Sequence, residues 1–95
     1  MPAYVIVDIE VTDPEQYERY KTLAPATVAA YGGRYVARGG ATLSLEGGWQ
    51  SERLVILEFD SLERARAWHD SPAYRAARTL RQSATRSRMI AVEGV

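Results

Sequence analysis

Residues 3–11, with the sequence AYVIVDIEV, decide the fold of this chain because their side chains alternate in character. Every second position carries a β-branched aliphatic side chain, and these positions are Val5, Val7, Ile9 and Val11. The positions between them hold Tyr4, Ile6, Asp8 and Glu10. A period of two with β-branched residues is typical of a β-strand. The stretch therefore predicts a strand with one wholly apolar face and one mixed face.

A helix is predicted directly after this strand. Asp13 is a suitable N-cap, Pro14 fits the first helical position, and Gln16 stands where the partner of a capping box belongs. An apolar stripe follows at helical spacing and consists of Tyr17, Tyr20, Ala24, Val28 and Tyr31. We expect Pro25 to kink or split this helix, because proline removes a backbone donor. The pair Gly32-Gly33 is expected to end it.

The remaining elements follow without a linker. Residues 34–45 predict a second strand, in which Gly39-Gly40 marks a bulge or a close backbone approach. Residues 46–51 predict a turn, and residues 53–60 predict a third strand of nearly continuous apolar character. A helix is expected from Asp60 or Ser61 onward. Ser71-Pro72 should interrupt it and cap a new helix, and residues 89–92 predict a fourth strand.

The resulting order, β-α-β-β-α-β, predicts a single α+β domain over residues 1–95 with the ferredoxin-like arrangement. Right-handed crossovers place both helical segments on one face of the four-stranded antiparallel sheet. The other face would carry both apolar and charged side chains, namely Tyr4, Ile6, Asp8, Ile56, Glu58, Ile90 and Val92. A bare face of this kind would be an unusual exposed patch. We therefore expect a homodimer that packs sheet to sheet as a dimeric α/β barrel and encloses a polar-lined cavity.

The composition is that of an ordinary globular protein, with 95 residues of which 46% are apolar and 25% charged. Cysteine is absent, which excludes disulfides and thiolate metal sites and fits a reducing compartment. Neither a signal peptide nor a membrane span is recognisable, so we expect a cytoplasmic protein without a membrane partner. Arginines are concentrated in residues 61–88, but they are scattered along helical turns without interleaved aromatic residues or a glycine loop. A solvated helix face is therefore expected there, not a nucleic-acid site.

The whole chain resembles the domain-of-unknown-function family numbered 1330, within the dimeric α/β-barrel superfamily. The likeness rests on Asp13-Pro14-Glu15-x-Tyr17-x-x-Tyr20, Gly32-Gly33-Arg34-Tyr35, Ala37-Arg38-Gly39-Gly40, Leu45-Glu46-Gly47, Ile56-x-Glu58-Phe59, Ala67-Trp68-x-x-Ser71-Pro72-x-Tyr74, Leu80-Arg81 and Val92-Glu93-Gly94. The resemblance implies a ferredoxin-like protomer and a barrel dimer. It implies no single reaction, since related members look like cofactor-free monooxygenases, lactone isomerases and haem-active enzymes. His69 stands where tyrosine is more usual in this family, so the resemblance assigns His69 no role.

Three charged residues on strands, Arg38, Asp8 and Glu58, are the candidate catalytic residues. Asp8 and Glu58 share the phase of the open sheet face. Because a buried charge is costly unless it is paired, we expect Arg38 to pair with these carboxylates. In an enzyme, one carboxylate would be the base and Arg38 would stabilise developing negative charge. The alternative is an ion pair at a dimer interface without catalysis.

The candidate ligand-binding residues are Tyr17, Tyr20, Trp68, His69, Ser71, Tyr74 and Arg81. The aromatic residues suit a planar organic molecule, although an aromatic stripe at helical spacing is also typical of a core. Ser71 is a natural N-cap, and Tyr74 and Arg81 share a helix face. His69 suits a general base, an axial haem ligand or a helix-end residue on the surface, and no metal-ligand partner stands three or four residues after it. No phosphate loop or nucleophile elbow is present.

The sequence thus predicts a homodimer that binds a small carboxylate-bearing or aromatic molecule in a cleft between sheet and helices. An enzyme built this way would be a monooxygenase, isomerase or lyase that needs no cofactor and no metal. The alternative is a dimeric binding or accessory module whose polar interior is structural. Haem binding through His69 is a third possibility.

Overall fold

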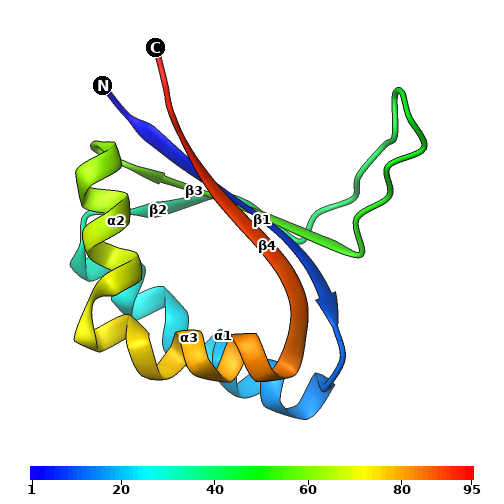
Figure 1. Ribbon diagram of the computed structural model, residues 1–95, viewed down its shortest axis with the longest axis horizontal. Coiled ribbons are helices and arrows are strands. Elements are labelled where there is room, and N and C mark those ends of the chain that lie inside the picture. Colours follow the sequence, from blue (N-terminus) through cyan, green and yellow to red (C-terminus); the bar gives the residue numbers. More distant parts are fainter.

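The computed structural model describes residues 1–95 as a four-stranded sheet with all its helices on one face (Figure 1). The strands are β1 (Ala3–Val11), β2 (Arg34–Arg38), β3 (Arg53–Phe59) and β4 (Thr85–Glu93). The helices are α1 (Pro14–Ala30), α2 (Leu62–Asp70) and α3 (Pro72–Ala84). None of the three helices combines the length and the apolar character that crossing a membrane requires.

The sheet has the strand order β2-β3-β1-β4, and every neighbouring pair is antiparallel. β1 lies between two partners: Val7, at its centre, is opposite Val55 of β3 and Met89 of β4. This order, with helices on a single face, confirms the predicted ferredoxin-like α+β arrangement.

The alternation in β1 has the predicted consequence. Val5, Val7 and Ile9 are buried under the helices, whereas Tyr4, Ile6 and Asp8 are only partly covered. The same core contains Val55, Leu57 and Phe59 of β3, as expected from their phase. Trp68 and Tyr74 fill the space beneath the helices, with ring centroids 4.1 Å apart.

The helix ends follow the sequence signals closely. Asp13 caps α1 by accepting a hydrogen bond from the Gln16 amide at 3.2 Å, but the Gln16 side chain accepts from Arg19 and does not complete a capping box. α1 continues through Pro25 as one helix, so the predicted split does not occur. Ser71 ends α2 and caps α3, accepting from the Tyr74 amide at 3.1 Å, which confirms the predicted break.

The second strand is shorter than predicted, and the fourth is longer. β2 ends at Arg38, and residues 39–52 form a loop that projects from the body (Figure 1). The register shift lies between Tyr35 and Ala37, not at Gly39-Gly40. The alternative prediction for Gly39-Gly40, a close backbone approach, is confirmed at Gly39. This residue has a φ of 71°, and a side chain there would meet the Arg53 guanidinium. β4 begins at Thr85, four residues before the predicted start at 89.

We expect Gly33→Ala to destabilise the protein by about 1–3 kcal/mol, because overpacking a core forces its neighbours out of place. A Cβ at Gly33 would lie 2.5 Å from an atom of the Phe59 ring, which is itself buried. Gly40→Ala is the matched control, since nothing lies within 4 Å of its Cβ position. Urea denaturation of both variants measures the effect, and equal midpoints would contradict this account of the β2 start.

Candidate functional site

A cavity of about 350 Å³ lies between the sheet and the helices of the single chain. Tyr17 and Tyr20 line it from α1, and Trp68 lines it from α2. Every strand also contributes side chains: Val7 and Ile9 of β1, Tyr35 and Arg38 of β2, Arg53, Val55 and Leu57 of β3, and Met89 of β4. The cleft predicted between sheet and helices is therefore present, with largely aromatic and aliphatic walls.

The charged side chains in the cavity wall are all basic. Lys21, Arg38 and Arg53 line the cavity, and no aspartate or glutamate does. Lys21 forms an ion pair with Glu18 on the same helix. The guanidinium of Arg38 lies over the Tyr35 ring at 4.2 Å, and Arg53 Nε donates to the Tyr17 hydroxyl at 2.8 Å. Neither arginine has a carboxylate partner.

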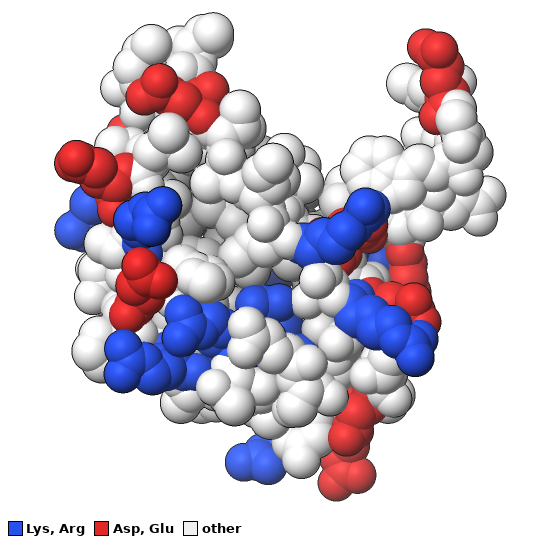
Figure 2. Space-filling model, viewed as in Figure 1, with Lys and Arg blue, Asp and Glu red and all other residues white.

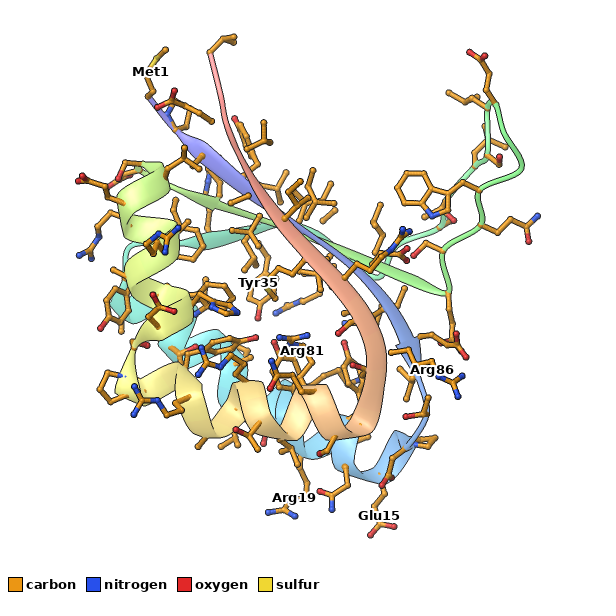
Figure 3. The ribbon with its side chains drawn as sticks, in the orientation of Figure 1. Met1, Glu15, Arg19, Tyr35, Arg81 and Arg86 are labelled. Carbon is orange, nitrogen blue, oxygen red and sulfur yellow. The ribbon has the colours of Figure 1, made fainter.

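Arg81 provides a further cation just behind the cavity wall. Its side chain is 4% exposed; Nε donates to the Tyr74 hydroxyl at 3.3 Å, and a terminal nitrogen donates to Ser87 Oγ at 2.6 Å. Tyr74 in turn shares a hydrogen bond of 2.8 Å with the Tyr20 hydroxyl. Arg81 and Tyr35 point into the space between sheet and α3 from opposite sides, whereas Arg19 and Arg86 point outward (Figure 3). No carboxylate contacts Arg81 either.

Burial favours the protonated form of two cavity hydroxyls, those of Tyr20 and Tyr35. Desolvation raises the pKa of Tyr20 well above the ordinary value of 10.0, and the neighbouring Tyr74 raises it further. Desolvation also raises the pKa of Tyr35, although its hydrogen bond with Arg38 acts in the opposite direction. These tyrosines are therefore hydrogen-bond donors at neutral pH and not bases.

A β-bulge decides which face Arg38 joins. Tyr35 is opposite Leu57 and Arg38 is opposite Val55, and both partners point toward the helices. If residues 34–38 alternated regularly, with no bulge at Val36, Arg38 would share the face of Arg34. The bulge therefore brings Tyr35 and Arg38 together at the cavity.

The predicted pairing of Arg38 with Asp8 and Glu58 is wrong. Both carboxylates lie on the open face, as their phase required, while the bulge turns Arg38 to the opposite face. Asp8 accepts from Arg88 at 2.9 Å and from Ser51 at 2.6 Å, and these bonds hold the pKa of Asp8 below its usual value.

Glu58 binds Arg34 instead, accepting from its Nε at 3.0 Å. The carboxylates and the cavity are therefore separated by the sheet itself.

The remaining candidates divide into two groups. Tyr17, Tyr20 and Trp68 lie in the cavity wall, and Tyr74 and Arg81 support it from behind.

His69 and Ser71 lie outside the cavity. The ring of His69 is near Asp70 and Arg78 in an open depression between α2 and β4. Ser71 is the cap of α3 described above. The helix break thus has a structural basis, and the structure places His69 away from the other candidates.

Sequence reasoning missed Tyr35, Arg53, Lys21 and Met89 as cavity residues. Arg53 could have been predicted, because it alternates in phase with Val55 on a strand whose covered face the sequence identifies. Met89 likewise faces the helices from β4. Tyr35 depends on the phase of β2, which the unforeseen bulge changes halfway along the strand.

The outer surface has mixed charge. Basic and acidic side chains are interspersed over the face shown in Figure 2. Ion pairs there and at the sheet edge join Arg78 to Asp70, Arg86 to Glu10 and Arg88 to Asp8. No group of three or more histidine, aspartate or glutamate side chains is arranged to hold a metal ion.

Fold and cavity together define a ferredoxin-like α+β protein with a basic, aromatic-lined pocket. The chain belongs to the family described as Domain of unknown function (DUF1330), whose model matches residues 2–95. The resemblance inferred from the sequence is thereby confirmed. No curated protein matches the sequence.

Solved structures share the fold at low identity. A protein of unknown function from Rhodopseudomonas palustris superposes with a TM-score of 0.80 at 22% identity, over 99% of this chain and 82% of that one. SnoaB, a cofactor-independent oxygenase from Streptomyces nogalater, gives 0.70 at 16% identity, over 99% and 93%. A dimeric ferredoxin-like protein of unknown function from Thermobifida fusca gives 0.68 at 22% identity, over 99% and 92%. These similarities establish the fold.

The raised pKa values of Tyr20 and Tyr35 predict a loss of stability at high pH. A group with a raised pKa in the folded state stabilises the fold below its unfolded pKa, 10.0 for tyrosine, and this contribution is lost as the pH rises toward the folded value. The wild type should lose more unfolding free energy than Tyr20→Phe between about pH 9 and about pH 11. Denaturant titrations at several pH values measure this difference, and parallel profiles would show that Tyr20 ionises normally.

Proposed function

We propose that this protein binds a small organic anion in the cavity between sheet and helices. One observation carries the proposal: Arg38, Arg53 and Arg81 face or support the same cavity, and none has a carboxylate partner. Of the three, Arg81 is buried, Arg53 is half-buried and Arg38 is exposed. Burying a cation such as Arg81 without a counter-charge costs on the order of several kcal/mol, because the charge loses its hydration. An anionic ligand would supply the missing charge.

The walls of the cavity favour a flat ligand with apolar surface. Tyr17, Tyr20, Tyr35 and Trp68 present aromatic rings, and Val7, Val55 and Leu57 complete an apolar lining. The volume of about 350 Å³ lies at the lower end of the range typical of small-molecule sites. We therefore propose an aromatic or conjugated compound that carries a carboxylate, phenolate or enolate oxygen.

The same groups would support catalysis on such a compound. Arginines and protonated tyrosines placed at an oxyanion stabilise the negative charge that develops when a carbon acid loses its proton. SnoaB, which shares the fold, is named as a cofactor-independent oxygenase. A cofactor-free oxygenase or isomerase is therefore the enzymatic form of this proposal, with Arg38 and Arg53 as the electrostatic groups in the cavity.

A non-catalytic binding module is the second candidate, and a specific observation favours it. The cavity wall contains no carboxylate and no histidine that could remove a proton, since Asp8 and Glu58 lie beyond the sheet. Without a protein base, only a substrate that is already acidic would react. Oxygen uptake with dihydroxyaromatic compounds distinguishes an oxygenase from a binding module, because a binding module would bind them without consuming oxygen.

We also propose that two copies pack through their open sheet faces. Ile90 is 66% exposed on β4, and Val92, Val36 and Ile56 extend the same apolar surface. The projecting loop adds Leu43 and Leu45, which are 80% and 83% exposed. Exposed apolar side chains that adjoin one another are typical of an interaction surface. The Thermobifida fusca protein, which shares the fold, is described as dimeric. The cytoplasmic location and the absence of a nucleic-acid partner remain predictions from the sequence.

We expect the unfolding free energy of Arg81→Met to lie within about 1 kcal/mol of the wild-type value. The variant should bind organic anions far more weakly. Replacing a buried, poorly compensated charge by an apolar side chain of similar length is often neutral or stabilising. Native mass spectrometry would detect a co-purifying ligand, and calorimetry with naphthoate and naphthamide would measure anion selectivity.

Arg75→Met is the matched control, since Arg75 is an exposed arginine on the same helix. If Arg81→Met is destabilised but its folded fraction still prefers naphthoate to naphthamide as the wild type does, the role of Arg81 is structural.

Ile90→Glu tests the homodimer. The substitution should convert the dimer to a folded monomer, because it places two like charges in an interface built around β4. Leu62→Glu, which alters an exposed apolar residue on α2, should leave the dimer intact. Sedimentation equilibrium measures the mass. A monomeric wild type, or an Ile90→Glu protein that remains dimeric, would contradict packing through the open face.

A further inference from the structure

Arg81, Tyr74 and Tyr20 form a hydrogen-bonded chain that has three donor hydrogens but only two contacts. Arg81 Nε has only a hydrogen to give, and it gives it to the Tyr74 hydroxyl. The two tyrosine hydroxyls carry one hydrogen each but share a single contact, of 2.8 Å. One hydroxyl hydrogen therefore has no acceptor in the protein. Tyr74 is fully buried, whereas Tyr20 borders the cavity, so the surplus hydrogen is best accommodated on Tyr20, directed into the cavity.

Tyr17 ends a second, shorter chain of the same kind. Its hydroxyl accepts from Arg53 Nε at 2.8 Å, and no protein acceptor receives the hydrogen of that hydroxyl. Tyr17 is 5% exposed and lines the cavity, so water has little access to it from outside. This second chain is independent of the first, because it begins at Arg53 of β3, whereas the first begins at Arg81 of α3.

The two chains end side by side. Tyr17 and Tyr20 are separated by one turn of α1, and their rings are stacked with centroids 5.6 Å apart and an interplanar angle of 27°. Both rings line the same cavity. Each hydroxyl accepts from a group behind it, and this polarises its O–H bond and strengthens it as a donor.

We infer that Tyr17 and Tyr20 together form a two-donor site for the oxygens of a carboxylate or a comparable oxyanion, with Arg53 and Arg81 behind them. This inference rests on the proposed function and specifies which side chains recognise the anionic group. Two hydroxyl donors match the two acceptor oxygens of a carboxylate. They match an amide less well, since the amide nitrogen carries hydrogens and the hydroxyl oxygens already accept one hydrogen bond each. Anion selectivity therefore resides in neutral tyrosines, with the arginines acting through them.

Naphthoate and its neutral analogue naphthamide are suitable probes, titrated calorimetrically into the full-length protein. The wild type should bind naphthoate more tightly than naphthamide. Tyr17→Phe and Tyr20→Phe should each weaken naphthoate binding about 10-fold, the effect of losing one hydrogen bond to a charged group. Naphthamide affinity should change little, and the double variant should lose the selectivity.

Tyr31→Phe is the matched control, because Tyr31 lies just beyond the C-terminal end of α1 with its ring against Arg64, and it does not line the cavity. A second readout follows the tyrosine Cζ resonances in labelled wild-type protein. Naphthoate should shift the Cζ resonances of Tyr17 and Tyr20, assigned from the phenylalanine variants, and leave that of Tyr31 in place. Thermal denaturation of each variant establishes that it is folded.

The possible failures are distinguishable. If naphthoate binds the wild type selectively and both phenylalanine variants keep that selectivity, the two-donor site is wrong while the anion site stands. Loss of selectivity in Arg81→Met but not in Tyr20→Phe would lead to the same conclusion. If the wild type does not prefer naphthoate to naphthamide, the proposed function itself fails, and the two-donor site fails with it.

Discussion

The structure depends on one constraint, which is that β1 must keep its hydrogen-bond register with both β3 and β4. It pairs with β3 on one side and with β4 on the other over nearly its whole length. A slip of one residue would turn Val5, Val7 and Ile9 to the open face and Asp8 into the core. Because burying these aliphatic side chains favours one register strongly, β1 aligns the flanking strands and thereby sets the floor of the cavity.

Arg38 shows how a local irregularity can outweigh a correct global pattern. The order of elements, the N-caps at Asp13 and Ser71 and the covered face of β1 all follow from short-range rules, and the sequence predicts them. The bulge at Val36 has no comparable signature, since neither glycine nor a turn residue marks it. Predicting Arg38 by simple alternation therefore places it with Asp8 and Glu58, on the wrong side of the sheet.

The candidate site was predictable to the extent that it depends on helices. Tyr17, Tyr20 and Trp68 lie in the cavity because helical spacing directs them toward the sheet, and the same spacing brings Tyr74 and Arg81 to one face of α3. Their contacts with β-strand residues were not predictable in this way. The bond from Arg53 to Tyr17 joins residues 36 positions apart and depends on how α1 crosses the sheet. Such contacts need the tertiary structure.

Charge is segregated across the sheet in a chain whose net charge is zero. The carboxylates of Asp8 and Glu58 neutralise arginines on the open face, while the arginines on the helix side face only aromatic rings and hydroxyls. A carboxylate beside Arg81 would stabilise the folded protein more, but it would also cancel the positive potential of the cavity. Tyrosine and serine hydroxyls accept hydrogen bonds from the guanidinium groups of Arg53 and Arg81 without neutralising them. A cavity that is merely structural has no need of this arrangement, whereas a cavity that receives an anion depends on it.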